Sequence, residues 1–394
     1  MSETFSIGLE RCLVDPPAVL LGGARFGLLM NQASVDRGLR YACDLLARRF
    51  PGQLVALFSP QHGLWGEEQA NMIESPHSRY EPLDLPVYSL YSQTRRPTAE
   101  MLRGLDCLLV DLQDVGTRVY TFAWTVQQCL LACAEAEIPI VILDRPNPLG
   151  GAVEGPLLEP TFQSFVGGCS IPLRHGLTLG ELARLMNHEQ RIGARLQVVQ
   201  AAAWRRELWH GRPWIAPSPN MPRLETALVY PGQVLLEGTN LSEGRGTTLP
   251  FELAGAPFID PYDLVRALER FDHPGLALRP LRFVPTFDKW RGERCGGVAL
   301  QVTQPAAVRS VATTLALIGV ASSLYPQQFA WLPPPYEYER EKLPIDILFG
   351  SPGLRQRLAS GEPLGPDDIA SLTALDEPQW LARTRPSRLY ESGL

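Results

Sequence analysis

The sequence lacks the motifs by which common nucleotide, metal and serine-hydrolase sites are recognised. It has no GxGxxG after a first strand and no Walker lysine, which argues against an oxidoreductase or transferase that uses a nucleotide. It has neither GxSxG nor HExxH, and its six histidines show no ligand spacing. The sequence therefore indicates no metal centre and gives little support for a nucleotide cofactor.

Long apolar segments, an early basic region and an excess of positive charge are also missing. No window of about 18 uncharged apolar residues occurs, and the N-terminus does not have the pattern of a secretory signal. A formal net charge of -6 disfavours a nucleic-acid surface. The seven cysteines form no CxxC pair and indicate buried, reduced thiols. These features predict a cytoplasmic protein that acts on a small molecule, without nucleic-acid or membrane partners; they leave the oligomeric state open.

The length and the apolar pattern predict two domains of α/β structure. A chain of 394 residues exceeds the size at which one core usually stops growing. From Phe26 to about Gln200, apolar runs alternate with segments of helical period, which is typical of a parallel sheet covered by helices. The composition changes near the PSPNMP stretch at 217–222. We therefore place the boundary at Thr226, with one domain over residues 1–226 and a second over residues 227–394.

The nearly continuous apolar runs are typical of strands buried on both faces. In the first domain we expect strands at 26–32, 54–60, 107–114 and 139–146. We expect helices at 41–50, 98–105, 120–136 and 178–188, the last beginning with a capping box of Thr178 and Glu181. In the second domain we expect strands at 281–287 and 298–304, a helix at 307–324 and short terminal helices.

Polar residues follow each expected strand of the first domain. Because ligands of open parallel sheets bind outside the carboxyl ends of the strands, these residues predict one cleft. Asp111 and Asp114 end the third strand and precede Arg118. These groups can bind sugar hydroxyls, or a structural ion pair can hold the loop to the following helix. Arg145 and Asn147 follow the fourth strand on a backbone fixed by prolines.

Two further segments carry candidate binding residues. The loop at 59–75 combines His62, Glu67 and Glu74 with glycines and apolar residues, and a solvated surface loop is its plain alternative. Asn220 lies in the SPNMP stretch. A glycine-rich loop in the second domain can close over the cleft, and it carries Glu237, Asn240, Glu243 and Arg245.

A series of motifs in one order resembles the exo-β-N-acetylmuramidase (NamZ-like) glycoside hydrolases. The motifs are NQASVDR, SPQHGLWG, PVYSLY, RRPTAEML, DLQDVGTRVYT, LDRPNPLGG, EGPLLEP, IPLRHGLTLGEL, PSPNMP and EGTNLSEGRGT. The resemblance implies a Rossmann-like catalytic domain followed by a smaller α/β domain that closes the cleft. It also implies release of N-acetylmuramic acid from the non-reducing end of β-1,4-linked peptidoglycan fragments, a step of peptidoglycan recycling.

The sequence departs from the family at one important position. Relatives resemble EHG after the second strand and carry a candidate catalytic glutamate there, whereas this chain has Gln61. A glutamine cannot transfer a proton as a carboxyl group does. Three alternatives follow: another acid such as Glu67 or Glu74 acts, the substrate assists, or the protein only binds muropeptides and has lost hydrolysis.

Among these alternatives we predict Glu74 as the general acid, because flanking Met72 and Ile73 can raise its pKa. For the second carboxyl role we expect Asp111 or Asp114, and Glu243 is the next candidate. The resemblance further implies that Arg118, Arg145 or Arg245 meets the lactyl carboxylate, since arginine pairs bidentately with carboxylates. The remaining predicted substrate-binding residues are Gln61, His62, Asn147, Asn220 and Asn240.

Overall fold

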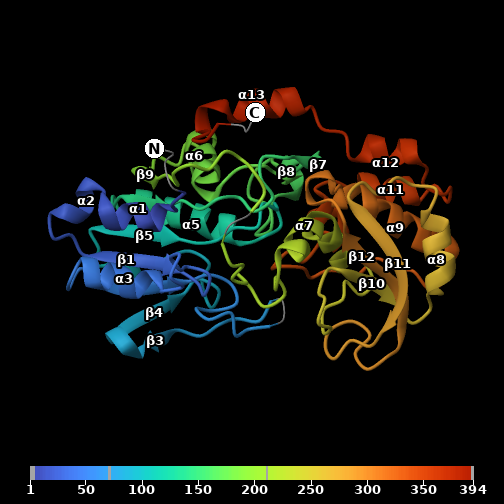
Figure 1. Ribbon diagram of the computed structural model, residues 1–394, viewed down its shortest axis with the longest axis horizontal. Helices are drawn as coiled ribbons and strands as arrows, with labels where there is room; N and C mark the ends of the chain where they lie inside the picture. The colour runs from blue at the N-terminus through green and yellow to red at the C-terminus, as the bar shows by residue number, and fades with distance from the viewer. Residues whose placement is uncertain (1–4, 70–71, 210–211, 392–394) are drawn as a thin grey trace.

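The computed structural model describes residues 5–69, 72–209 and 212–391, which form two lobes side by side (Figure 1). The first lobe contains a seven-stranded sheet. Its strands are, in spatial order, β3 (Ser78–Tyr80), β4 (Leu85–Ser89), β2 (Leu54–Ser59), β1 (Phe26–Met30), β5 (Cys107–Asp111), β6 (Ile140–Leu143) and β9 (Leu196–Val199). Neighbouring strands are parallel except β3, which pairs antiparallel with β4.

The chain reverses direction across the sheet between β1 and β5, which are neighbours. The carboxyl ends of these two strands therefore form the switch point at which ligands of doubly wound sheets bind. All four strands predicted for this lobe are confirmed, each with fewer residues at its carboxyl end than expected. The residues beyond those ends are loops, and it is these loops that face the second lobe.

Helices cover both faces of the first sheet. One face packs against α1 (Gly8–Val14), α2 (Ala18–Leu21) and α3 (Ala42–Arg49). The other face packs against α4 (Ala99–Leu102), α5 (Phe122–Glu135) and α6 (Leu179–Glu189). The predicted capping box at the start of α6 is confirmed, because the Thr178 hydroxyl accepts from the Glu181 amide and the Glu181 carboxylate accepts from the Thr178 amide. The predicted α/β layering is thus correct.

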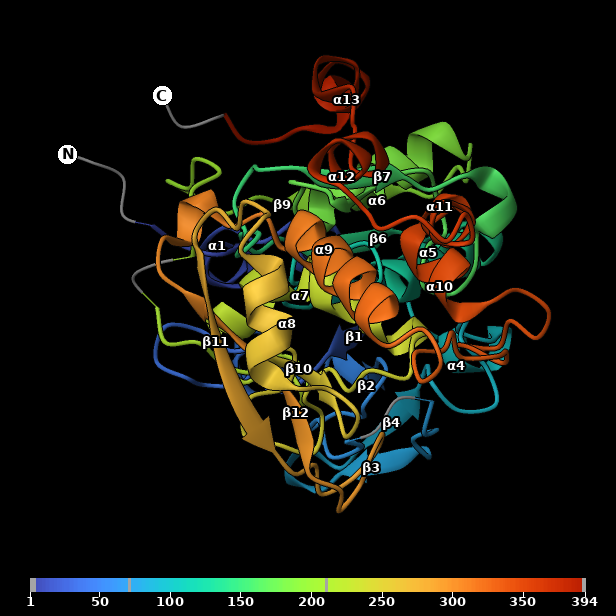
Figure 2. The same ribbon diagram turned by 90° about the vertical axis from the view of Figure 1, so that its right-hand side faces the viewer.

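The second lobe is smaller and contains a three-stranded antiparallel sheet. Its spatial order is β10 (Leu253–Ala256), β12 (Cys295–Val302) and β11 (Leu276–Phe283). Helices of this lobe are α7 (Leu224–Gln233), α8 (Pro261–Leu268), α9 (Ser310–Leu324), α10 (Pro344–Phe349), α11 (Gly353–Leu358) and α12 (Pro366–Leu372). Helix α8 packs against β11 and β12, and α9 lies beside α8 (Figure 2).

Both strands predicted for the second lobe begin and end earlier than the sequence predicts, β12 by two or three residues and β11 by more. The expected strand at 281–287 shares only residues 281–283 with β11, because β11 pairs with β12 from Leu276 to Phe283. Its side chains are exposed or half-buried except at the two ends, Leu276 and Phe283, and Pro280 interrupts the apolar pattern. Register with β12, rather than local apolar density, therefore sets the bounds of this strand.

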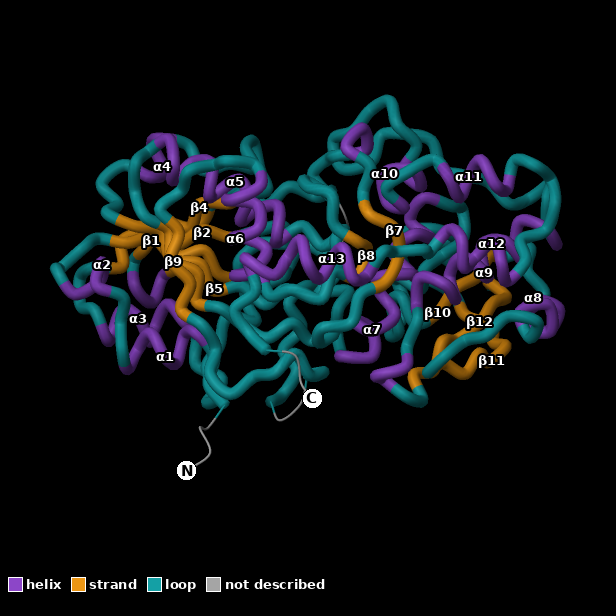
Figure 3. The backbone as a smooth tube through the Cα atoms, turned by 90° about the horizontal axis from the view of Figure 1, so that it is seen from above, coloured by secondary structure: helices purple, strands orange, loops and turns teal. Residues whose placement is uncertain are grey.

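The two lobes are connected by more than one segment. An antiparallel pair, β7 (Glu154–Leu157) and β8 (Pro172–Arg174), lies between the two sheets (Figure 3). Near the C-terminus, α13 (Glu377–Thr384) returns to the first lobe, where the Trp380 indole donates to the His175 carbonyl. The boundary predicted at Thr226 lies inside α7 at a fully buried residue. The division into residues 1–226 and 227–394 stays a prediction.

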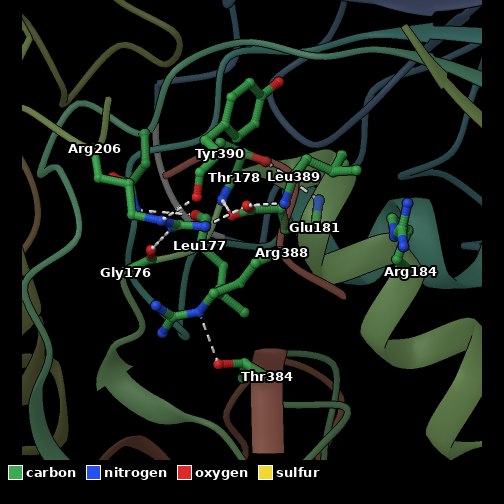
Figure 4. Close-up of polar contacts among 12 residues, drawn as sticks. Gly176, Leu177, Thr178, Glu181, Arg184, Arg206, Thr384, Arg388, Leu389 and Tyr390 are labelled. Carbon is green, nitrogen blue, oxygen red and sulfur yellow. Dashed lines mark hydrogen bonds and ion pairs between the residues drawn. The ribbon is translucent and has the colours of Figure 1, made fainter. Parts of the chain in front are cut away.

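The chain after α13 is fastened to the first lobe by buried polar groups (Figure 4). Glu181, which is fully buried, accepts from the Leu389 amide at 2.7 Å and pairs with Arg206. The Tyr390 hydroxyl donates to Asp144 at 2.6 Å. Because these are contacts between charged or strongly polar groups out of water, they fix the tail where it lies.

The seven cysteines are buried and unpaired, which confirms the thiol prediction. Within the described parts of the chain, no helix is long and apolar enough to cross a membrane.

Candidate active site

A polar pocket lies between the two lobes at the carboxyl ends of β2 and β5. It encloses about 420 Å³ of space, part of it open to solvent. The first lobe contributes loops after β2 and β5 and the stretch near Asn220. The second lobe contributes α7, the 3-10 turn η3 (Val234–Gly238), the glycine-rich loop and a late segment. The lining residues are Gln61, His62, Val119, Tyr120, Thr121, Val166, Ser218, Asn220, Met221, Tyr230, Glu237, Arg245, Phe251, Tyr336 and Glu337.

Gln61 and Glu337 meet at the centre of this pocket. The Thr121 hydroxyl donates to Gln61 Oε1 at 2.7 Å, which orients the amide so that Nε2 donates to Glu337 Oε1 at 3.3 Å. The Tyr91 hydroxyl donates to Glu337 Oε2 at 2.7 Å. Burial raises the pKa of Glu337 despite these two donors, because water can no longer solvate the charged form. Glu337 is therefore poised to carry a proton.

The backbone at the pocket is held in an uncommon conformation on both sides. His62 has φ 75° and Glu337 has φ 41°, both in the left-handed region that residues with a Cβ rarely adopt. Such conformations concentrate at functional sites, where the surrounding structure enforces them. They aim the two side chains into the space between the lobes.

The second carboxyl group of the pocket belongs to Glu237, which is part of a charged cluster. Arg245 donates to Glu237 Oε1 at 2.7 Å and lies 3.2 Å from Glu243, while the Tyr336 hydroxyl donates to Glu237 Oε2 at 2.6 Å. Lys289 Nζ lies 2.8 Å from Glu243 Oε2. Burial alone would raise the pKa of Glu243, but Lys289 and Arg245 outweigh it and lower that pKa.

His62 and Asn220 complete the wall formed by the first lobe. The His62 ring contacts the Glu68 carbonyl through Nδ1 at 2.7 Å. Burial lowers the pKa of His62 to about 4, so the ring is neutral at pH 7 and offers a hydrogen bond rather than a charge. The Asn220 side chain donates to the Gln69 carbonyl at 2.9 Å. Both residues are uncharged polar groups suited to sugar hydroxyls or an amide.

Of the residues predicted from the sequence, the structure brings Gln61, His62, Asn220 and Arg245 together in the pocket. Glu243 does not line the pocket but pairs with Arg245, which does. These residues come from both lobes, so the predicted cleft between them contains a shared site.

Glu74 does not line the pocket. Its side chain is 52% exposed and lies 3.1 Å from Arg95, whose guanidinium stacks on Tyr91. Met72 and Ile73, expected to shield it, are themselves exposed. The apolar surroundings on which its predicted role as the general acid depends are therefore absent. The role itself stays a prediction.

Asp111 and Asp114 also lie outside the pocket lining. The Arg145 guanidinium donates to both carboxylate oxygens of Asp111, at 2.6 and 2.8 Å, in a buried ion pair. Asp114 accepts from the Gly116 amide at 2.7 Å, which closes the turn after β5. The contacts therefore favour the alternative of a structural ion pair. The partner of Asp111 in this pair is Arg145 and not Arg118.

Three more predicted residues are occupied by backbone contacts. Arg118 is buried and donates to the carbonyls of Pro156, Ile171, Leu348 and Phe349. Asn147 donates to the Leu177 carbonyl and accepts from the Leu149 amide. Asn240 joins the carbonyl of Gln328 to the amide of Ala330. None of the three lines the pocket.

Sequence reasoning missed Glu337, Tyr336 and Tyr91 as members of the site. Glu337 lies 276 positions after Gln61, so no local pattern connects the two residues. The signal that could have drawn notice is the YEYE stretch at 336–339, an alternation of aromatic and acidic residues directly after a proline run.

A sheet with its switch point at an interlobe pocket, two carboxyl groups in that pocket and a neighbouring arginine define a two-lobed α/β enzyme. The N-terminal domain of exo-beta-N-acetylmuramidase NamZ matches residues 26–225, and the C-terminal domain of NamZ matches residues 228–390. The chain therefore belongs to the NamZ family.

Individual relatives agree with this assignment. The peptidoglycan beta-N-acetylmuramidase NamZ of Bacillus subtilis (strain 168) is 46% identical over 316 residues, which cover 79% of this chain and 76% of the relative. Two crystal structures of DUF1343 family proteins from Bacteroides fragilis NCTC 9343 share the fold. One has a TM-score of 0.86 at 30% identity and covers 98% of this chain and 99% of the other. The second has a TM-score of 0.75 at 26% identity and covers 99% and 100%.

Proposed function

We propose that this chain is an exo-acting glycoside hydrolase that releases N-acetylmuramic acid from the non-reducing end of β-1,4-linked peptidoglycan fragments. The observation that carries the proposal is the pair of buried carboxyl groups, Glu237 and Glu337, in one pocket of a NamZ-family chain. Glycoside hydrolysis commonly uses two carboxyl groups, one to protonate the leaving oxygen and one to stabilise or attack the sugar carbon.

Arg245 is the residue of the pocket best suited to the lactyl carboxylate of muramic acid. Its Nη1 is buried and makes no hydrogen bond within the described structure, so one strong donor remains for a ligand. The charges of Arg245 and Lys289 balance those of Glu237 and Glu243, which leaves the cluster without a net negative charge to repel the substrate. His62 and Asn220 would hold hydroxyls or the acetamido group.

The substrate is in this view a small carbohydrate, and the reaction uses no metal or cofactor. Asp111, Asp114, Arg118, Arg145, Asn147 and Asn240 would act through the framework that shapes the pocket. We place the protein in the cytoplasm, in the recycling of cell-wall fragments, because its composition and thiols fit a reducing compartment.

The proposal is tested with matched substrates on the purified full chain. A chromogenic β-N-acetylmuramide should be hydrolysed, whereas the corresponding glucosaminide, which lacks the lactyl group, should not. Oligosaccharides with muramic acid at the non-reducing end should lose that sugar, and those ending in glucosamine should stay intact. Binding of free N-acetylmuramic acid without hydrolysis of any substrate would instead identify a muropeptide-binding protein.

A further inference from the structure

We propose that Glu337 is the proton donor to the glycosidic oxygen, and that Gln61 and Tyr91 are positioning residues that orient its carboxyl group. This inference rests on the function proposed above. It assigns the acid to a segment of the second lobe, so the loop after β2 contributes an amide to the site instead of a carboxyl group.

Gln61 itself cannot transfer the proton, and its orientation is fixed. Its Oε1 accepts from Thr121, so its Nε2 is the atom that faces Glu337. An amide neither gives up nor accepts a proton near neutral pH. Gln61 is buried, with 4% of its surface exposed, and it can therefore hold the neighbouring carboxyl group in one place.

Glu337 meets the requirements of a general acid. Only 3% of its surface is exposed, and it lines the pocket. Each of its oxygens accepts one hydrogen bond, from Gln61 or from Tyr91, and each keeps a further lone pair that can carry the proton. Burial and the nearby Glu237 raise its pKa, whereas Tyr91, Gln61 and Arg95 lower it, and burial dominates. The other titratable groups that interact with it are the hydroxyls of Tyr230 and Tyr336.

Glu237 fits the second carboxyl role. Both of its oxygens accept hydrogen bonds, from Arg245 and from the Tyr336 hydroxyl, and these two donors fix the position of the carboxyl group. In the reaction the Glu337 proton moves to the glycosidic oxygen, which keeps the electron pair of the breaking bond to the sugar C1. Water then forms the new bond to C1, and one of its protons restores the carboxyl group of Glu337.

The first test compares leaving groups. A nitrophenolate leaves without much help from an acid, whereas the sugar hydroxyl of a natural disaccharide needs the proton. Glu337→Gln should therefore lower kcat/KM for the disaccharide by about 10²–10⁴-fold and for the nitrophenyl muramide much less. The matched control is Glu341→Gln, the same chemical change at an exposed position four residues away, which should alter neither value.

The second test uses the pH dependence of kcat/KM. Activity should fall as the pH rises through the pKa of Glu337, since the acid is active only when protonated. Gln61→Glu would place two carboxyl groups in contact and should move this alkaline limb to higher pH. Tyr91→Phe removes a donor that stabilises the ionised form, so it should move the limb in the same direction while keeping the ring.

Several results would overturn the assignment. Full activity of Glu337→Gln on the disaccharide would do so, and so would an equal loss on both substrates. If Glu74→Gln rather than Glu337→Gln showed the dependence on the leaving group, the acid would be Glu74. If Glu337→Gln failed to fold, an unchanged alkaline limb in both Gln61→Glu and Tyr91→Phe would refute the proposal. A wild-type chain that cleaves no muramide would instead refute the proposed function.

Discussion

Replacing Arg118 with methionine should destabilise the protein without weakening substrate binding. The guanidinium is fully buried and joins the β7–β8 region to the C-terminal end of α10 through four carbonyl oxygens. It does not line the pocket between the lobes. Methionine is similar in length and apolar, so the change removes the donors while filling most of the space.

The expected magnitude follows from two opposing terms. Four hydrogen bonds from a charged donor contribute about 1.5–3 kcal/mol each, or about 6–12 kcal/mol together. Burial lowers the pKa of Arg118 to about 9. This shift corresponds to a penalty on the charged form of about 5 kcal/mol, at about 1.4 kcal/mol per pKa unit. We therefore expect Arg118→Met to lower the free energy of unfolding by about 1–7 kcal/mol, the difference between the two terms.

The assay is urea unfolding followed by circular dichroism, with KM for the muramide measured at a temperature where both proteins are folded. Arg48→Met is the control, because Arg48 is exposed on α3 and its loss should change the free energy of unfolding by less than about 0.5 kcal/mol. An unchanged unfolding midpoint together with a tenfold higher KM would refute the reasoning and would indicate that Arg118 binds the substrate.

Three other predictions test the framework of the site. Burial raises the pKa of Asp144 from 3.8 to about 6, so the folded state holds this proton more tightly than the unfolded state. As the pH rises from about 4 to 7, the free energy of unfolding of the wild type should therefore fall by about 3 kcal/mol relative to Asp144→Asn. Urea titrations at a series of pH values measure this difference. Gly232→Ala should cost about 3 kcal/mol or more by calorimetry, because a Cβ there would lie 1.9 Å from the Ser310 carbonyl oxygen. Arg145→Met should cost about 3–5 kcal/mol by leaving Asp111 unpaired, and adding Asp111→Leu should recover most of that loss in the same unfolding assay.

The sequence by itself determined the elements of the first lobe and the family. Apolar runs such as 107–111 are buried on both faces of a parallel sheet, and this burial leaves a local, continuous pattern that can be read without a partner strand. The capping box of Thr178 and Glu181 is likewise local, since the contacts join residues three apart. The ordered motifs carried the family for the same reason, because each is a short contiguous stretch.

Only the tertiary structure decided which charged residues face the pocket. Asp111 ends β5 and Arg145 follows the neighbouring strand β6. The sequence cannot tell whether such groups reach a ligand or neutralise each other, and the structure pairs them. It also brings Glu337 against Gln61 across 276 positions of chain. Contacts of this kind depend on how two lobes dock, and docking is set by packing of whole surfaces rather than by any local pattern of residues.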